Sequence, residues 1–436
     1  MDLGQKVRHF GFAGFDYLQG GKTRHHLNDL RRCFADPTGS SVLQSDRLNR
    51  LLHHACETVP FYKDYTGFDS IGSFPIIEKT AITKNYDSFL SSAYSRSSLK
   101  TAITSGSYGT PTTYWHTRDK SARRLAEVLY FNHWAGYQVG MKHVLVRVRP
   151  KSRLTCFIEN EIIFNPIGVD KTWLARKRKV LRNQGVKIII GYPSILAALA
   201  KFSQEKGDSK DDFSLGGIIS IAEPLAGEDR ITIEAVYGCK VLCRYSSEEF
   251  GVLAHQCSTG EKYHINEASY LVEILHPRED RPVNRGETGR VVVTDLFSQA
   301  MPLIRYDTGD LAVFGEQCSC GLDTPVLDRI DGRVVEVIYD TRGRMVSPLT
   351  VVTPIARTLE GILQFQFIQQ DIKKYLIRLV VFSSFPKAKV SRISDQLKSR
   401  LGEDAEIKYE YVDSIQPLPS GKRPYIINEY NQSGLA

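Results

Sequence analysis

The sequence predicts an α/β protein with a large N-terminal domain of mixed sheets and a small α+β C-terminal domain. Between residues 143 and 245, apolar strand-like segments alternate with helical ones, which is typical of a largely parallel sheet. From about residue 269 the strands are joined by polar loops, which indicates a β-rich, antiparallel segment. Beyond Arg333 the pattern changes again, to strands around one amphipathic helix. We therefore expect domains at residues 1–333 and 334–436.

The spacing of apolar residues places the individual elements. Residues 1–100 have a mostly helical pattern. Helices are expected at 43–58, 114–134, 173–184 and 226–237, and strands at 143–148, 186–191, 217–222, 240–245, 270–275, 290–296, 376–382 and 407–412. The helix of the C-terminal domain is expected from the apolar stripe Val390, Ile393, Leu397 and Leu401.

The composition is that of an ordinary globular protein, with 436 residues, 42% hydrophobic and 24% charged residues and a net charge of +8. Neither a signal-peptide pattern nor an apolar run of membrane-spanning length is found, so a cytoplasmic protein without a membrane span is expected. Clustered cysteines then favour metal binding over disulfides. The basic runs at 147–153 and 176–182 are interpreted as a solvated helix face or the rim of an anionic-substrate site. Nucleic-acid binding is not expected, because no recognition motif accompanies the charge.

A loop rich in glycine and hydroxyl groups lies at residues 104–113. Its glycines let backbone N–H groups approach an anion closely, and its hydroxyls add donors. It lacks the Gly-Lys-Ser/Thr ending of a Walker loop, and alone it is equally well interpreted as an ordinary turn. The candidate phosphate-binding residues are Thr104, Ser105, Gly106, Ser107, Gly109 and Thr110.

Further motifs follow in order along the chain. In residues 244–251, Glu249 follows a strand where a carboxylate can hold Mg²⁺, and Tyr245 can stack on a base; a surface acidic pair is the alternative. In residues 301–311, Asp310 is expected on a tight turn, as an acceptor for two ribose hydroxyls. Residues 329–336 form the next motif. In residues 418–424, Lys422 stands on a glycine-containing loop, from which a cation can reach a phosphate.

Five motifs in this order resemble the adenylate-forming superfamily of acyl-CoA synthetases and adenylation domains. Val59-Pro-Phe-Tyr62, Phe74-Pro-Ile-Ile-Glu-Lys79 and Met301-Pro-Leu-Ile-Arg-Tyr306 are similar to its phenylacetate–CoA ligase branch, and to the capsule-biosynthesis relatives of that branch. The resemblance covers roughly residues 45–430. It implies a two-step reaction, in which a carboxylate attacks the α-phosphate of ATP and a thiol or amine then attacks the acyl-adenylate.

The resemblance also implies roles for single residues. The loop would cradle the β- and γ-phosphates, Glu249 would place Mg²⁺, and Lys422 would bridge the charge that develops during adenylation. Ala222, Glu223 and Pro224 match the segment beside the adenine, and Arg333 matches the arginine before the interdomain hinge. The candidate acid-binding residues are His133, Trp134, Tyr137, Tyr192 and Ser194. The spacing of His133 and Trp134 fits packing in the protein core as well.

The chain departs from the family pattern at several positions. Val335 replaces the aspartate that usually follows the hinge arginine, and Asp331 is a candidate substitute. Ser246 replaces a glycine, and Glu248 adds a carboxylate before Glu249. These changes put a standard transfer to CoA in doubt and leave the nucleotide site intact.

Cys257, His264, Cys318 and Cys320 form a candidate zinc site. Three thiolates and an imidazole would make a closed tetrahedral shell of the structural type. The spacing is looser than in a zinc finger, but some relatives of the branch show the same pattern, so the resemblance strengthens the prediction. Ordinary free residues are the alternative.

Three functional classes remain from the sequence. The first is a ligase that passes an activated acid to CoA, a carrier-protein thiol or an amine. The second is a catalytically degenerate nucleotide-binding scaffold on the same fold. The third is a nucleic-acid or membrane-surface binder that uses the basic runs. Neither the acid nor the acceptor follows from the sequence.

Overall fold

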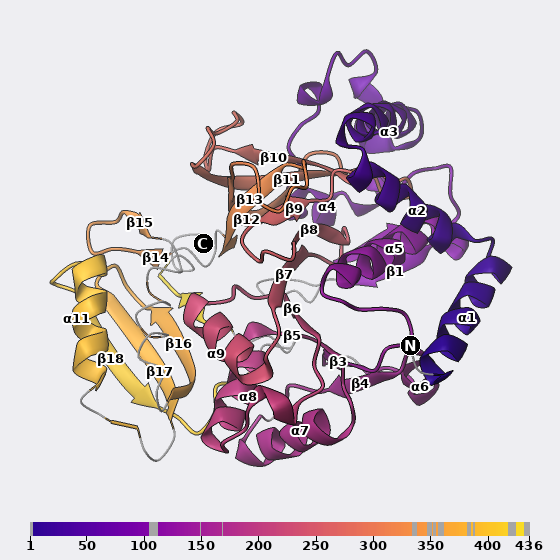
Figure 1. Ribbon diagram of the computed structural model, residues 1–436. Helices are drawn as coiled ribbons and strands as arrows, with labels where there is room; N and C mark the ends of the chain where they lie inside the picture. Colours follow the sequence, from indigo (N-terminus) through magenta and orange to yellow (C-terminus); the bar gives the residue numbers. More distant parts are fainter. Residues whose placement is uncertain are drawn as a thin grey trace. The chain divides into compact units, whose positions relative to one another are not determined.

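In the computed structural model the chain forms two compact units, Met1–Met141 with Leu242–Ile330 and Lys142–Val241 with Asp331–Ala436. Figure 1 labels the helices and strands. Each unit is described by itself. The structure describes residues 3–103, 112–148, 150–167, 169–333, 338–346, 351, 355, 362–381, 385–386, 389–416 and 424–430.

Two helices of the first unit, α3 and α5, begin where a polar side chain satisfies a free backbone amide. Asp36 accepts a hydrogen bond from the Gly39 amide at the start of α3, and Thr117 accepts one from the Lys120 amide at the start of α5. The helices are α1 (Leu3–Leu18), α2 (Lys22–Ala35), α3 (Pro37–Thr58), α4 (Lys79–Lys84) and α5 (Arg118–Trp134).

The sheet of the first unit is largely antiparallel. Its strand order is β10-β11-β12-β13-β9-β8-β7, and β10–β11, β11–β12, β13–β9, β9–β8 and β8–β7 pair antiparallel. A core of aromatic and aliphatic side chains, including Tyr62, Phe74, Tyr270 and Tyr306, packs here. The strands are β7 (Val241–Ser246), β8 (Val252–Gln256), β9 (Tyr263–Ile265), β10 (Tyr270–Leu275), β11 (Thr288–Asp295), β12 (Tyr306–Phe314) and β13 (Val326–Arg333). Two further strands, β1 (Lys100–Ile103) and β2 (Thr113–His116), pair antiparallel on either side of the predicted phosphate loop.

The second unit contains the parallel strands that the sequence predicts. They pair in the order β6-β5-β3-β4, all parallel, and the isoleucine runs 188–190 of β5 and 218–219 of β6 are buried. The strands are β3 (His143–Val146), β4 (Glu161–Phe164), β5 (Ile188–Gly191) and β6 (Gly217–Ile221), and the helices are α6 (Arg153–Glu159), α7 (Lys171–Asn183), α8 (Pro193–Glu205) and α9 (Gly227–Tyr237).

The C-terminal residues of this unit form a small sheet of the order β18-β17-β16-β19. Its central pair is antiparallel and its outer strands run parallel to their neighbours. Ile393, Leu397 and Leu401 of α11 pack into its core, as their spacing predicts. The elements are β14 (Ile338–Tyr339), β15 (Met345–Val346), β16 (Ile362–Gln369), β17 (Lys374–Val381), α11 (Lys389–Leu401), β18 (Glu406–Tyr411) and β19 (Ile426–Asn428).

The predicted fold class is confirmed, and two local predictions are wrong. The helix expected at 114–134 begins only at Arg118, because the residues before it form β2. Asp310 lies in β12, at a bulge where the register with β11 shifts, and not on a tight turn. Gly309, with φ of 72°, supplies the left-handed residue that this bulge needs. The division at residues 333 and 334 stays a prediction.

The buried ion pair of Lys120 and Asp295 generates a stability prediction. Both side chains are 0% exposed, and Nζ lies 2.7 Å from Oδ2. Lys120→Ala would leave a buried carboxylate without its partner, so we expect the free energy of unfolding to fall by about 3–5 kcal/mol. Urea unfolding measures this. Arg50→Ala, which breaks a solvent-exposed pair with Asp46 on α3, should change it by at most about 0.5 kcal/mol. Equal losses in the two variants would contradict the prediction.

Candidate active site and metal centre

Tyr245 at the end of β7 and Asp310 in the bulge of β12 form a direct contact. The tyrosine hydroxyl donates to Asp310 Oδ2 over 2.6 Å. Thr308 holds the bulge in place, because its Oγ1 accepts from the Asp310 amide at 3.1 Å and donates to the Val291 carbonyl at 3.0 Å. The fold therefore brings together two predicted nucleotide-binding residues that are 65 positions apart in the sequence.

Glu249 lies in the short loop that joins β7 to β8 and is buried. Ser247 and Gly251 exchange two backbone hydrogen bonds of 3.1 Å across this loop, which fixes its shape. The neighbouring Glu248 is exposed and pairs with Arg124 of α5, at 3.4 Å. Glu248, the additional carboxylate of this chain, is thus paired with Arg124 and lies next in sequence to Glu249, the candidate magnesium ligand.

Helix α5 supports the Glu249 loop through a fully buried carboxylate. Glu127 accepts hydrogen bonds from the Val252 amide at 3.1 Å and from the Tyr270 hydroxyl at 2.9 Å. A Cβ on Gly251, whose φ is 141°, would lie 2.3 Å from Glu127 Oε2. This support was not predicted from the sequence. The one sequence signal for it is the spacing of Lys120, Arg123 and Glu127, which places the three charges on one face of the helix.

In the second unit, a predicted nucleotide-binding residue contacts a predicted acid-binding one. The Ser194 amide, in the first turn of α8, donates to Glu223 Oε2 over 3.1 Å. A carboxylate is favourable at a helix N-terminus. Ala222 has a φ of 69°, a left-handed conformation that costs a residue with a Cβ about 1–2 kcal/mol. The turn after β6 is therefore strained where it presents Glu223.

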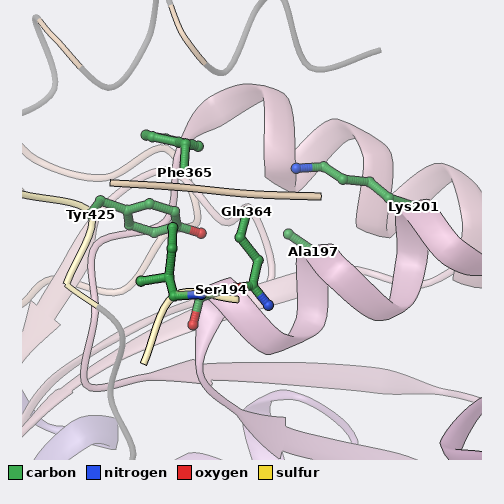
Figure 2. Close-up of a pocket in the computed structure, with 7 residues that line it drawn as sticks. Ser194, Ala197, Lys201, Gln364, Phe365 and Tyr425 are labelled. Carbon is green, nitrogen blue, oxygen red and sulfur yellow. Dashed lines mark hydrogen bonds between the residues drawn. The ribbon is translucent and has the colours of Figure 1, made fainter. Parts of the chain in front are cut away.

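A pocket in the same unit lies between α8 and the C-terminal sheet (Figure 2). Beside it, the Tyr425 hydroxyl donates to the buried Asp229 at 3.2 Å, and Lys201 pairs with the other oxygen of Asp229 at 2.8 Å. Burial raises the pKa of Tyr425, which keeps the phenol protonated as a donor. The pocket is lined by Ser194, Ala197, Lys201, Gln364, Phe365, Ile415 and Tyr425.

The four predicted metal ligands come together in the first unit. Their ligand atoms all lie within 4.8 Å of one another. Cys257 Sγ is 3.7 Å from Cys318 Sγ, and Cys320 Sγ is 3.3 Å from His264 Nε2. A tetrahedral zinc with bonds of about 2.3 Å to sulfur holds its sulfurs about 3.8 Å apart. The donor set and its spacing therefore fit zinc.

The surroundings orient the histidine for such a site. The outer nitrogen of His264, Nδ1, lies 2.7 Å from Thr324 Oγ1, which leaves Nε2 facing the thiols. Burial lowers the pKa of His264 to about 4, so the ring is neutral at neutral pH. The Trp134 ring stands edge-on to the imidazole, with centroids 5.7 Å apart. These contacts match the outer shell of a metal-binding histidine.

The chain is similar to several known proteins. Residues 338–429 match the CapK C-terminal domain. Protein CapK of Staphylococcus aureus is 22% identical over 434 residues, which cover 94% of each chain. Phenylacetate-coenzyme A ligase of Thermus thermophilus is 26% identical over 348 residues, 75% of this chain and 77% of the relative. These similarities support the adenylate-forming superfamily, and within it the branch of CapK and phenylacetate–CoA ligase, as the ordered motifs predict.

A solved structure confirms the adenylate-forming fold. A 2-hydroxyisobutyryl-CoA ligase in complex with R3-HIB-AMP superposes with a TM-score of 0.73 at 20% identity, over 89% of each chain. The anthranilate CoA ligase AuaEII in complex with anthranoyl-AMP gives a TM-score of 0.55 at 16% identity, over 76% of this chain and 66% of that one.

Several predicted residues of the nucleotide site lie outside the described residues. They are Thr104, Ser105, Gly106, Ser107, Gly109, Thr110 and Lys422. Arg333 ends β13, and only its backbone is described. Asp331, the candidate substitute for the missing aspartate, is buried in the same strand.

The predicted acid-binding residues have different surroundings. Trp134 packs against Phe34 and Phe131 in a core cluster, which favours the core interpretation of its spacing. His133, one residue earlier, is exposed. Tyr137 and Tyr192 are buried, and Tyr192 precedes the first residue of α8. Their roles in acid binding stay predictions.

The basic run of α7 has partners within its own unit. Arg178 binds Asp208 through two guanidinium nitrogens, and Arg182 pairs with the same carboxylate at 3.2 Å. These arginines are held by acidic groups, which disfavours a nucleic-acid role for the run. None of the described helices combines the length and the apolar character that crossing a bilayer requires.

The close approach of Gly251 to Glu127 generates a second prediction. Gly251→Ala would place a methyl group against the buried carboxylate and force φ of 141° on an alanine. We expect the variant to lose about 2–4 kcal/mol of unfolding free energy. Gly227→Ala is the matched control, because nothing lies within 4 Å of a Cβ there. Urea denaturation of both variants checks this, and equal midpoints would be inconsistent with a crowded Gly251.

Proposed function

We propose that the protein activates a carboxylic acid with ATP as an acyl-adenylate and then transfers the acyl group to the thiol of coenzyme A. The observation that carries the proposal is the contact between Tyr245 and Asp310. This contact connects the motif at residues 244–251, which contains Glu249, to the motif at residues 301–311, which contains Asp310. Similarity to phenylacetate–CoA ligases supports the same activity.

The chemistry needs positioned charges rather than a covalent protein intermediate. A carboxylate oxygen of the acid attacks the α-phosphorus of ATP, the bond to the β-phosphate oxygen breaks, and pyrophosphate leaves. In the second step a thiolate sulfur attacks the acyl carbon, and AMP leaves with the electron pair of the broken C–O bond. Asp310 would bind the ribose hydroxyls, and Tyr245 would hold that carboxylate in place.

Two cations would complete the site. Glu249 would hold Mg²⁺, a hard ion that prefers carboxylate oxygens and neutralises phosphate charge when bound. Glu248 pairs with Arg124, so Glu249 would be the one carboxylate of the loop that binds the metal. Lys422 would supply the second cation, as the resemblance implies.

Coenzyme A is the proposed acceptor because the phenylacetate–CoA ligases among the relatives are named for it. A carrier-protein thiol or an amine would need the same adenylate and differ only in the second step. Pyrophosphate release with CoA and without it separates these possibilities.

A pyrophosphate assay over a panel of aryl, alkyl and amino acids tests the proposal. We expect at least one acid to elicit ATP-dependent release that CoA accelerates. Lys422→Ala should slow release by about 10²–10³-fold, since it removes a cation that stabilises the transition state. Lys408→Ala, on the exposed face of β18, is the control and should leave the rate unchanged. No release with any acid, and no effect of Lys422→Ala, would favour the nucleotide-binding scaffold.

We also propose that Cys257, His264, Cys318 and Cys320 hold a structural zinc ion. Four protein ligands close the coordination shell, so the ion would stabilise the fold and take no part in the reaction. The site would tie the loop after β8 to the segment before β13. A reducing, cytoplasmic compartment, which the sequence predicts, would keep the thiols available.

Metal analysis of protein purified without added zinc tests this site. We expect about one zinc per chain by mass spectrometry of the metal content. Cys318→Ser should lose most of the zinc and lower the melting temperature, whereas Cys156→Ser, at a cysteine outside the cluster, should keep it. A folded wild-type protein without bound metal would overturn the proposal.

A further inference from the structure

Helix α1 presents a stripe of apolar residues to solvent, and its two buried residues, Gln5 and Asp16, are polar. Along Leu3–Leu18, large apolar side chains recur at helical spacing, and their exposed fractions run from 63% for Val7 to 82% for Leu18. A helix of a water-soluble domain normally has the opposite arrangement. The exposed stripe consists of Leu3, Val7, Phe10, Tyr17 and Leu18.

Polar contacts hold the opposite face of α1 in place. The side-chain amide of the buried Gln5 donates to Gln138 Oε1 at 3.4 Å. The backbone carbonyl of Gln5 also lies close to Gly140, since a Cβ on that glycine would be only 2.8 Å from the carbonyl oxygen. The buried Asp16 accepts hydrogen bonds from the amides of Thr23 and Arg24, both 3.0 Å long. The start of α2 thus fixes the end of α1, and the apolar stripe is left facing outward.

Helices α1 and α2 carry more basic than acidic side chains, although Lys22 pairs with Asp119 of α5 and Arg32 pairs with Asp29. Residues 3–35 contain two acidic side chains, Asp16 and Asp29, and both are buried with partners inside the first unit. The basic side chains of the same two helices are exposed or half-buried. They are Lys6, Arg8, Lys22, Arg24, Arg31 and Arg32.

We propose that α1 binds an anionic lipid surface, lying in the interface with its apolar stripe inserted among the headgroups. An amphipathic helix with apolar and aromatic residues on one face and flanking cations has the chemistry for this. Each cation near such a surface contributes attraction of its own. A second copy of the chain fits less well, because pairing two of these stripes would bring like charges together.

Vesicle sedimentation of the full chain tests the proposal. We expect binding to vesicles of phosphatidylcholine with phosphatidylglycerol, and weaker binding to phosphatidylcholine alone and at high salt. The double variant Val7→Glu/Phe10→Glu should reduce binding by about tenfold or more, because it puts charge in place of inserted apolar area. Lys6→Glu/Arg31→Glu should weaken binding to the anionic vesicles and make it less sensitive to salt.

Ile231→Glu is the matched control, because it puts the same charge at an apolar residue of α9 that is also exposed. It should bind vesicles as the wild type does, and all variants should keep the wild-type melting temperature. The proposal fails if the wild type does not sediment with anionic vesicles, or if Val7→Glu/Phe10→Glu sediments equally well. It also fails if the wild type is a dimer in solution that this double variant turns into a monomer, since a second copy would then cover the stripe.

Discussion

The buried charges of α5 are the constraint on which the candidate site in the first unit depends. Lys120, Arg123 and Glu127 are all fully buried, on a helix that follows the predicted phosphate loop after one short strand. Arg123 pairs with Asp29 of α2, and Glu127 binds the backbone just after Glu249. Leaving any one of these charges buried without its partners would be far more costly than losing a surface contact. The helix therefore fixes the position of the Glu249 loop.

A second set of polar contacts holds the motif that carries Asp310. The Arg305 guanidinium binds Glu273 through two nitrogens, at 2.9 and 3.1 Å, and also donates to the Phe74 carbonyl. Ile77 pairs with the same segment, since its amide donates to the Arg305 carbonyl and its carbonyl accepts from the Asp307 amide, both at 2.9 Å. Arg305 has a left-handed φ of 49°, a strain that these charge-assisted contacts offset. Two sequence motifs that resemble the family are thus parts of one structural unit.

The sequence predicts what depends on apolar periodicity and on local chemistry. The parallel strands, the antiparallel segment and the stripe of α11 follow from spacing, because burial of apolar area decides them. The Cys-His cluster follows from residue type. The bulge at Asp310 does not, since Asp-Thr-Gly-Asp is a typical turn sequence and only pairing with β11 makes it part of a strand. The partners of Glu127 and Arg305 do not follow either, because they come from segments far away in the chain.

Exposed apolar groups and buried charges share a physical cause in this chain. A charged side chain enters the interior where partners from several elements satisfy it, as Glu127 and Arg123 show. When such polar contacts attach a helix to the protein, burial of its apolar side chains is no longer required to hold it there. In α1 the contacts of Gln5 and Asp16 fix the helix, whereas Phe10 and Leu18 are mostly exposed. Apolar side chains exposed in this way weaken the solubility of the chain unless another surface covers them. The orientation of α1 is therefore best explained by a partner outside the fold, and the surrounding cations indicate the charge of that partner.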